Sequence, residues 1–206
     1  MTATTVRERP ILFTGENVRA ILDGRKTMTR RVVTPQGRYG IVRNGRAVAL
    51  WSYCTEFGQA GAPLSPHYEV GMMLWVREKW AVNDEACLRY GTGERKWFGD
   101  VLINRIRNAH NVEHRFGEWR PSIFMPRWAS RLTLEVTAVR VERLQEIRVE
   151  DIIAEGIQST LREHDAVVDL REKWRHGWDT INGHRAPWAS NPWVFVIEFK
   201  PVEVPR

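Results

Sequence analysis

The run Gly24-Arg25-Lys26-Thr27-Met28-Thr29-Arg30-Arg31 decides how the fold of this chain is interpreted. It holds one lysine, three arginines and two threonines directly after a glycine. Residues 15–23 carry apolar side chains at helical spacing, and glycine is the usual residue just past a helix C-terminus. Residues 27–33 are rich in β-branched side chains and predict a strand. Most cationic runs are solvated surface, but hydroxyls interleaved with cations at such a turn are also typical of a small anion or nucleoside pocket.

Similar patterns predict the other elements. Alternation of apolar and polar residues favours strands over 130–143 and 193–200, and shorter strands are expected over 9–13 and over the apolar run 74–76. A short helix is expected over 149–154, and a capping box of Thr160 and Glu163 predicts a longer helix that ends at Asn182-Gly183. The apolar stripe expected for that helix is Val167, Leu170, Trp174, Trp178 and Ile181. We therefore expect an α+β fold: a small barrel or curved sheet of mixed, mostly antiparallel strands, with helices packed at its side.

Length and composition limit the class of protein. At 206 residues the chain fits one domain, with expected insertions at about 35–70 and 83–118. The first insertion contains a hairpin signal, Asn44-Gly45. No stretch reaches the roughly 20 apolar residues of a membrane span, and the polar residues 1–10 do not resemble a secretory signal. With two isolated cysteines in addition, the expectation is a reduced, cytoplasmic protein.

The positive charge is concentrated at one end of the sequence. Residues 1–50 hold ten Lys and Arg against three Asp and Glu, whereas the rest of the chain holds 21 against 22. Arginine suits planar, bidentate contacts with phosphates and base edges, and it accounts for 26 of the 31 cations. A phosphate-bearing partner near residues 24–31 and a compositional bias of the genome are both compatible with this pattern.

Four blocks of the sequence resemble the ASCH domain, a β-barrel relative of the PUA RNA-binding fold. Residues 22–31 are similar to its signature of a glycine, a lysine two residues later and an arginine about five residues beyond. Residues 71–78 resemble the second block, with Met72 where an aspartate is usual. Residues 132–141 and 193–199 are similar to the remaining barrel strands. The whole chain, particularly 119–131, resembles a larger subgroup common in phages and prophages, over about two thirds of its residues.

Within that family, the bacterial N4-acetylcytidine amidohydrolase has a Gly-x-Lys-Thr-x-Thr pattern that is similar to residues 24–29. The resemblance implies that Lys26 accepts a proton from Thr29, that Thr29 attacks an acyl carbonyl, and that Glu155 handles the proton of the leaving amine. Residues 26 and 29 of a regular strand point to opposite faces. A shared site therefore needs a bulge, or a Lys26 that still lies on the turn after the glycine.

Further residues are candidates for binding a nucleoside, a nucleotide or single-stranded RNA, with DNA as another possible partner. The cations Arg30 or Arg31 would hold an oxyanion or a phosphate, and the full set of binding candidates is Arg25, Arg30, Arg31, Arg77, Glu78, Trp119, Arg120, Arg127 and Trp128. For Glu78 a structural ion pair, and for the tryptophans a loop anchor, are the alternatives. His110 and His114 lack a third ligand, so no metal and no cofactor is expected.

Three functions stay open. The chain can be a hydrolase of an acylated or otherwise modified pyrimidine nucleoside, a non-catalytic RNA or modified-DNA binding module, or a ribonuclease of the kind attributed to some ASCH proteins. A structural role in a phage particle is a further alternative. No P-loop, dinucleotide fingerprint or Ser/Cys nucleophile motif is present in the sequence.

Overall fold

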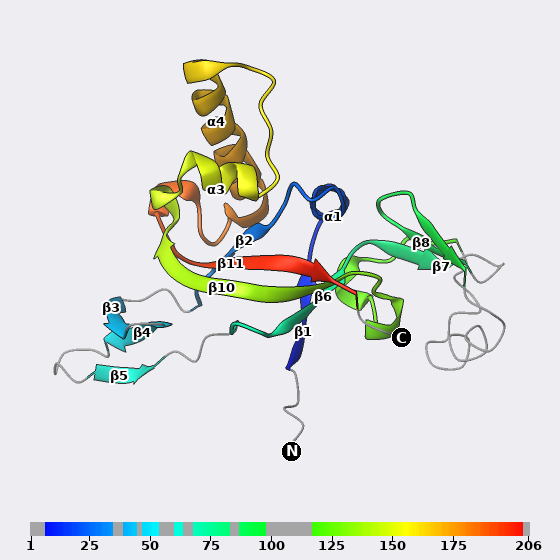
Figure 1. Ribbon diagram of the computed structural model, residues 1–206, viewed down its shortest axis with the longest axis horizontal. Coiled ribbons are helices and arrows are strands. Elements are labelled where there is room, and N and C mark those ends of the chain that lie inside the picture. The colour runs from blue at the N-terminus through cyan, green and yellow to red at the C-terminus, as the bar shows by residue number, and fades with distance from the viewer. Residues whose placement is uncertain are drawn as a thin grey trace. The chain divides into compact units, whose positions relative to one another are not determined.

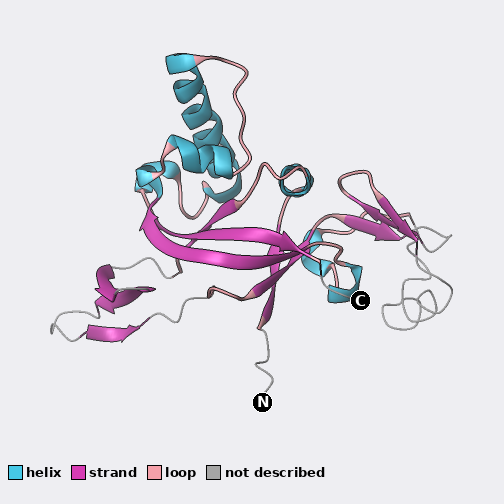
Figure 2. Ribbon diagram, viewed as in Figure 1, coloured by secondary structure: helices cyan, strands magenta, loops and turns pink. Residues whose placement is uncertain are grey.

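The computed structural model describes residues 7–34, 39–44, 47–53, 60–63, 68–82, 87–97 and 117–203. The chain divides into two compact units, of which the first comprises residues 1–23, 73–134 and 201–206 and the second residues 24–72 and 135–200. The interpretation as one domain with insertions stays a prediction. Helices, strands and short 3₁₀ turns are present together, which confirms the α+β class (Figure 2).

The largest sheet has five strands in the order β1-β6-β10-β11-β2. Their bounds are Glu8–Leu12 for β1, Met73–Arg77 for β6, Thr133–Arg143 for β10, Trp193–Val202 for β11 and Met28–Val32 for β2. The pair β1–β6 is parallel and the pair β2–β11 is antiparallel. All five strands were expected from the sequence pattern to within a few residues.

Two smaller sheets have three strands each. The first is β3 (Tyr39–Asn44), β4 (Ala47–Tyr53) and β5 (Ala60–Pro63), and the second is β7 (Trp80–Val82), β8 (Cys87–Tyr90) and β9 (Arg95–Trp97). Asn44 pairs with Ala47, which confirms the expected hairpin. All the strand pairs described within these two sheets are antiparallel.

In the second unit, α3 (Val149–Ala154) and α4 (Glu163–Asn182) pack on one face of β2 and β11 (Figure 1). The helices are amphipathic, so the core between helices and sheet takes apolar side chains from both. It consists of Met28, Leu144, Ile147, Ile152, Leu170, Trp174, Trp178, Val194 and Val196. The charged cluster of the candidate site lies on the same face of the sheet as this core.

The predicted start of α4 is wrong in its detail. The helix begins at Glu163 after Arg162, whose extended backbone occupies the N-cap position and whose side chain makes no cap hydrogen bond. Thr160 lies two residues before that cap and is therefore not the N-cap that the sequence predicted. The end at Gly183 is confirmed. The middle of the predicted stripe is buried, but its two end residues, Val167 and Ile181, are exposed.

The first unit contains β1, β6, the second small sheet and helix α1 (Gly15–Leu22). The hydroxyl of Thr14 caps α1 by accepting a hydrogen bond from the Asn17 backbone N–H at 3.3 Å. A separate core gathers under the loop of residues 121–130, which makes two 3₁₀ turns at Ser122–Phe124 and Arg127–Ala129. That core consists of Trp80, Val82, Leu88, Tyr90, Met125 and Ala129, with Trp128 packed against it.

Candidate functional site

The turn after α1 places Lys26 beside Glu155. Gly24 has a φ of +72°, a left-handed backbone conformation that is energetically unfavourable for residues with a Cβ atom. The chain then forms an isolated antiparallel bridge between Lys26 and Glu155, the residue that caps the C-terminus of α3. The adjacent Thr27 N–H donates to the Ala154 carbonyl at 2.8 Å. Backbone pairing with the end of α3 therefore fixes Lys26 just before β2 begins.

Lys26 and Glu155 form a buried ion pair. The Nζ of Lys26 lies 2.6 Å from Oε2 of Glu155 and also donates to the Glu155 backbone carbonyl at 2.9 Å. Each side chain is only 3% exposed. Burial lowers the pKa of Lys26, an effect that Glu155 opposes and that the neighbouring cations Arg31 and Arg30 reinforce. The result is a lysine that gives up its proton more readily than an ordinary lysine while it stays in contact with a carboxylate.

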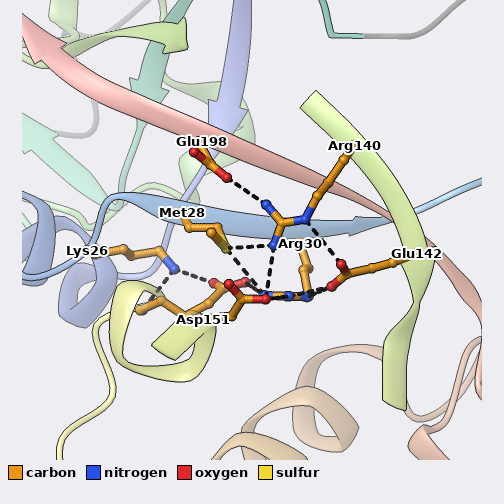
Figure 3. A network of polar contacts seen from close by, with 8 residues as sticks. Lys26, Met28, Arg30, Arg140, Glu142, Asp151 and Glu198 are labelled. Atoms are coloured by element: carbon orange, nitrogen blue, oxygen red, sulfur yellow. Dashed lines mark hydrogen bonds and ion pairs between the residues drawn. The ribbon is translucent and has the colours of Figure 1, made fainter. Parts of the chain in front are cut away.

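Arg30 is the third member of this group and is surrounded by carboxylates. Its guanidinium is completely buried; Nη1 donates to Oε1 of Glu155 at 3.3 Å and Nη2 to Oδ2 of Asp151 at 2.7 Å. Nε donates to Oε1 of Glu142 at 3.2 Å. Figure 3 shows these side chains converging from β2, β10 and α3. Glu155 is thus held by two cations, one at each carboxylate oxygen.

Arg140 extends the cluster along β10. Its guanidinium donates to Oδ2 of Asp151 at 2.9 Å, to Oε2 of Glu142 at 3.2 Å and to Oε1 of Glu198 at 2.6 Å (Figure 3). The hydrogen bonds and charges of Arg30 and Arg140 lower the pKa of Asp151 against the opposing effect of burial. Cations and carboxylates therefore alternate from Glu198 to Lys26 in one continuous network.

The other two predicted catalytic and binding positions on this strand lie differently. Thr29 is buried and faces Ile197 in the register of β2 and β11. Because side chains alternate along a strand, Thr29 and Arg31 project from the face opposite to that of Arg30. None of the hydrogen bonds among the described residues joins the Thr29 hydroxyl to Lys26 or Glu155. The structure therefore brings together Lys26, Arg30 and Glu155, whereas Thr29 is not joined to this group by a hydrogen bond among the described residues.

Arg31 and Arg25 complete the candidates in this unit. Arg31 is partly buried, and burial lowers its pKa although Tyr68 and Glu155 act to raise it. Arg25 donates to the Gly156 carbonyl at 3.3 Å and is partly exposed. Both cations thus lie close to the C-terminal end of α3, next to the Lys26–Glu155 pair.

The remaining predicted binding residues belong to the first unit. Glu78 is buried and accepts a hydrogen bond from Arg131 at 2.9 Å, which is the structural ion pair that the sequence left open. Arg77 donates to the Ile123 carbonyl at 3.0 Å, and Arg127 pairs with Glu8 at 2.9 Å. Trp128 packs edge-on against Trp80, and the guanidinium of Arg120 lies over the Trp80 ring. Most of these side chains therefore stabilise the loop of residues 121–130.

Trp119 is different, because the residue is 40% exposed and two cations lie over its ring. Lys79 Nζ lies 5.3 Å from the centroid of its ring and the guanidinium carbon of Arg89 lies 5.2 Å away. An exposed aromatic face beside cations is a common way to bind a nucleobase and its phosphate.

In the part of the chain that is described, no group of three or more His, Cys, Asp or Glu side chains has a metal-binding arrangement. His110 and His114 lie outside the described residues. None of the described helices is long and apolar enough to cross a bilayer.

The sequence analysis did not identify the carboxylates Glu142 and Asp151 or the cation Arg140. One signal was present: Asp151 and Glu155 are four residues apart, which places them on the same side of a helix. Arg140 and Glu142 are likewise two apart on a strand, hence on one face. What the sequence could not show is that these two faces meet at Arg30.

Comparisons with known proteins give one distant structural similarity. No protein-family model matches the chain, and no curated protein does. Among solved structures, the chain is similar to a high-resolution crystal structure of an ASCH domain from Lactobacillus crispatus JV V101. That similarity has a TM-score of 0.41 and 12% sequence identity, and it covers 95% of this chain and 79% of the other.

Proposed function

We propose that this chain is an ASCH-type protein that binds a nucleoside or nucleic acid and hydrolyses an N-acyl amide on a pyrimidine base, of the kind found in N4-acetylcytidine. The observation that supports this function is the buried Lys26–Glu155 pair with its 2.6 Å contact. The two residues are 129 positions apart in the sequence. The resemblance to the ASCH family assigned them one site, and their contact makes proton transfer between them feasible.

The chemistry uses the lowered pKa of Lys26. The neutral amine accepts the proton of the attacking hydroxyl, and the oxygen forms a bond to the acyl carbon. The carbon–nitrogen bond of the amide then breaks. The proton passes from Lys26 to Glu155 and on to the leaving amine of the base. When the nucleophile is Thr29, water then hydrolyses the acyl ester and releases the carboxylic acid, so that all atoms and protons are accounted for.

The position of Thr29 makes the identity of the nucleophile the decisive question. Its side chain leaves β2 on the face opposite to that of Arg30. Attack by Thr29 therefore requires the hydroxyl to reach Lys26 when substrate is bound, whereas attack by water requires only the Lys26–Glu155 pair. Thr29→Ala separates the two cases, because it abolishes turnover in the first and preserves it in the second.

The direct test is hydrolysis of N4-acetylcytidine, followed by chromatography of the cytidine formed. We expect wild type to be active and Lys26→Met and Glu155→Gln to lose activity by 100-fold or more, as is typical for loss of acid–base catalysis. Lys173→Ala is the control, since this lysine is exposed and its contacts, with Asp169 along α4 and with the Gln158 carbonyl, involve neither Lys26 nor Glu155. Equal activity of wild type and a folded Lys26→Met variant would refute the proposed chemistry.

A second candidate function, nucleic-acid binding without turnover, is favoured by Trp119 and its two flanking cations. A base stacked on this ring would contribute about 1–3 kcal/mol, so Trp119→Ala should weaken binding of a single-stranded RNA roughly 5- to 150-fold. Fluorescence anisotropy of a labelled oligonucleotide measures this affinity over a range of salt concentrations. Binding that is unaffected by Trp119→Ala would exclude this surface.

The same samples distinguish the remaining alternatives. Shortened RNA after incubation would indicate a ribonuclease, and intact RNA with steep salt dependence would indicate a binding module. A parallel titration with single-stranded DNA shows whether the 2′-hydroxyl contributes to recognition.

A further inference from the structure

From its place in a cationic run, Arg30 is expected to bind a phosphate. In the structure, however, its partners are carboxylates of the protein itself. Its side chain is fully buried, and its guanidinium donates hydrogen bonds to three carboxylates. These come from β10 and from α3 with its cap: Glu142, Asp151 and Glu155. The ring of Trp174 on α4 lies 5.8 Å from the guanidinium carbon. The guanidinium is thus enclosed by protein groups.

Burying such a cluster is not an economical route to stability. Charges that leave water lose several kcal/mol of hydration each, and well-packed apolar residues often replace buried ion pairs at no loss of stability. The cluster does, however, fix geometry. Glu155 has one oxygen on Lys26 and the other on Arg30, so its carboxylate cannot rotate away from the lysine.

We propose that Arg30 is a positioning residue, which holds the carboxylate of Glu155 against Lys26, and that it binds no phosphate. This inference rests on the proposed function for its catalytic consequence, but its electrostatic consequence can be measured without any substrate. Glu142 and Asp151 fix Arg30 in turn, and Arg140 fixes these two carboxylates from the other side (Figure 3).

The charges that face Lys26 give the direction of the effect. Glu155 raises the pKa of Lys26, whereas Arg31 and Arg30 lower it together with burial. Because the backbone bridge between Lys26 and Glu155 keeps the two residues together, loss of the Arg30 charge should raise the pKa of Lys26. Loss of the Asp151 charge, which partly neutralises Arg30 at 2.7 Å, should lower it. Two substitutions in one cluster thus predict shifts of opposite sign.

The experiment is an NMR titration of side-chain signals in protein labelled at its five lysines. We expect the pKa of Lys26 to rise in Arg30→Gln and to fall in Asp151→Asn. Lys173→Ala should leave the pKa of Lys26 unchanged. An unchanged Lys26 pKa in both cluster variants would overturn the inference. If Arg30→Gln does not fold, Asp151→Asn decides alone, because Asp151 is partly exposed and its loss is easier to accommodate.

Kinetics separate the inference from the proposed reaction. With an active wild type, Arg30→Gln should lower kcat roughly 10- to 100-fold and leave KM nearly unchanged, since misplacing a catalytic group affects the transition state more than binding. A raised KM with unchanged kcat would instead identify Arg30 as a substrate ligand and overturn the inference. Expected pKa shifts in a protein that shows no hydrolysis would support the positioning role and refute the proposed reaction.

Discussion

The substitution Lys26→Met tests whether the Lys26–Glu155 pair is energetically coupled as its geometry indicates. Methionine is similar in length to lysine and leaves the carboxylate of Glu155 buried without its closest partner. Breaking a buried pair from one side typically costs about 3–5 kcal/mol. Because Glu155 keeps its 3.3 Å contact with Arg30, we expect the lower end, about 3 kcal/mol.

The reverse substitution, Glu155→Gln, should cost less than this. Lys26 retains its hydrogen bond to the backbone carbonyl of residue 155 at 2.9 Å. Its pKa is already lowered by burial, so the lysine can lose its proton once the carboxylate is gone, which limits the penalty. The double variant has no buried charge left to compensate between these two positions. We therefore expect it to be more stable than the sum of the single effects implies, with a coupling of about 2 kcal/mol.

Urea unfolding followed by tryptophan fluorescence measures these free energies. Trp174 and Trp178 lie in the core beside the cluster and report on its unfolding. With a slope of about 2.5 kcal/mol per molar urea, a loss of 3 kcal/mol lowers the midpoint by about 1.2 M. Additive single effects, to within about 0.5 kcal/mol, would refute the coupling and show that the two side chains only lie near each other.

Two further predictions concern the pH dependence of this cluster, and a third concerns the glycine turn before Lys26. The pKa of Asp151 is lowered, so its ion pairs stabilise the folded state fully above the ordinary aspartate pKa, near 3.8. This stabilisation is lost as the pH falls through the lowered pKa. The difference in unfolding free energy between wild type and Asp151→Asn should therefore disappear in acid. For Lys26 the affected range lies between its lowered folded pKa and 10.5, where the unfolded state binds more protons than the folded state. In that range the unfolding free energy of wild type should rise with pH relative to that of Lys26→Met. The value of kcat/KM should also rise with pH below 10.5, and Lys26→Arg should lack this rise. Gly24→Ala should cost about 1–2 kcal/mol, seen as a lower Tm, because φ is +72° there, whereas Gly177→Ala in the helix α4 should not destabilise since nothing lies within 4 Å of its added Cβ.

Local sequence patterns were sufficient for most of the secondary structure. Residues 15–22 and 149–154 form helices at the predicted places, and the two long strands β10 and β11 follow their alternating patterns. The start of α4 could not be read locally. Thr160 and Glu163 have capping-box spacing, but the backbone enters the helix only at Arg162. The choice between two starts a few residues apart depends on the chain before the helix and on the core beneath it.

The candidate site could be predicted in part. Lys26 and Glu155 follow from the resemblance to the N4-acetylcytidine amidohydrolase of the ASCH family, and the structure shows their contact. The partners of Arg30 depend on which strand and which helix meet beneath β2, and this information lies in no single segment of the sequence. An arginine in a cationic run looks the same whether it faces phosphate or carboxylate. Only the tertiary arrangement distinguishes the two.

This distinction changes what the uneven charge distribution means. The excess of cations in residues 1–50 favours an anionic partner only as far as those cations reach solvent. Lys26 and Arg30 do not, because carboxylates from residues 142–155 compensate them inside the protein. In the proposed function, steering of a phosphate toward the site therefore depends on partly exposed cations such as Arg25, whereas Arg30 acts together with burial and Arg31 to lower the pKa of Lys26. Each phosphate contact contributes about −0.7 to the slope of log K against log salt concentration for a single strand. Arg25→Gln should therefore make this slope for RNA binding less steep, whereas Arg30→Gln should leave it unchanged.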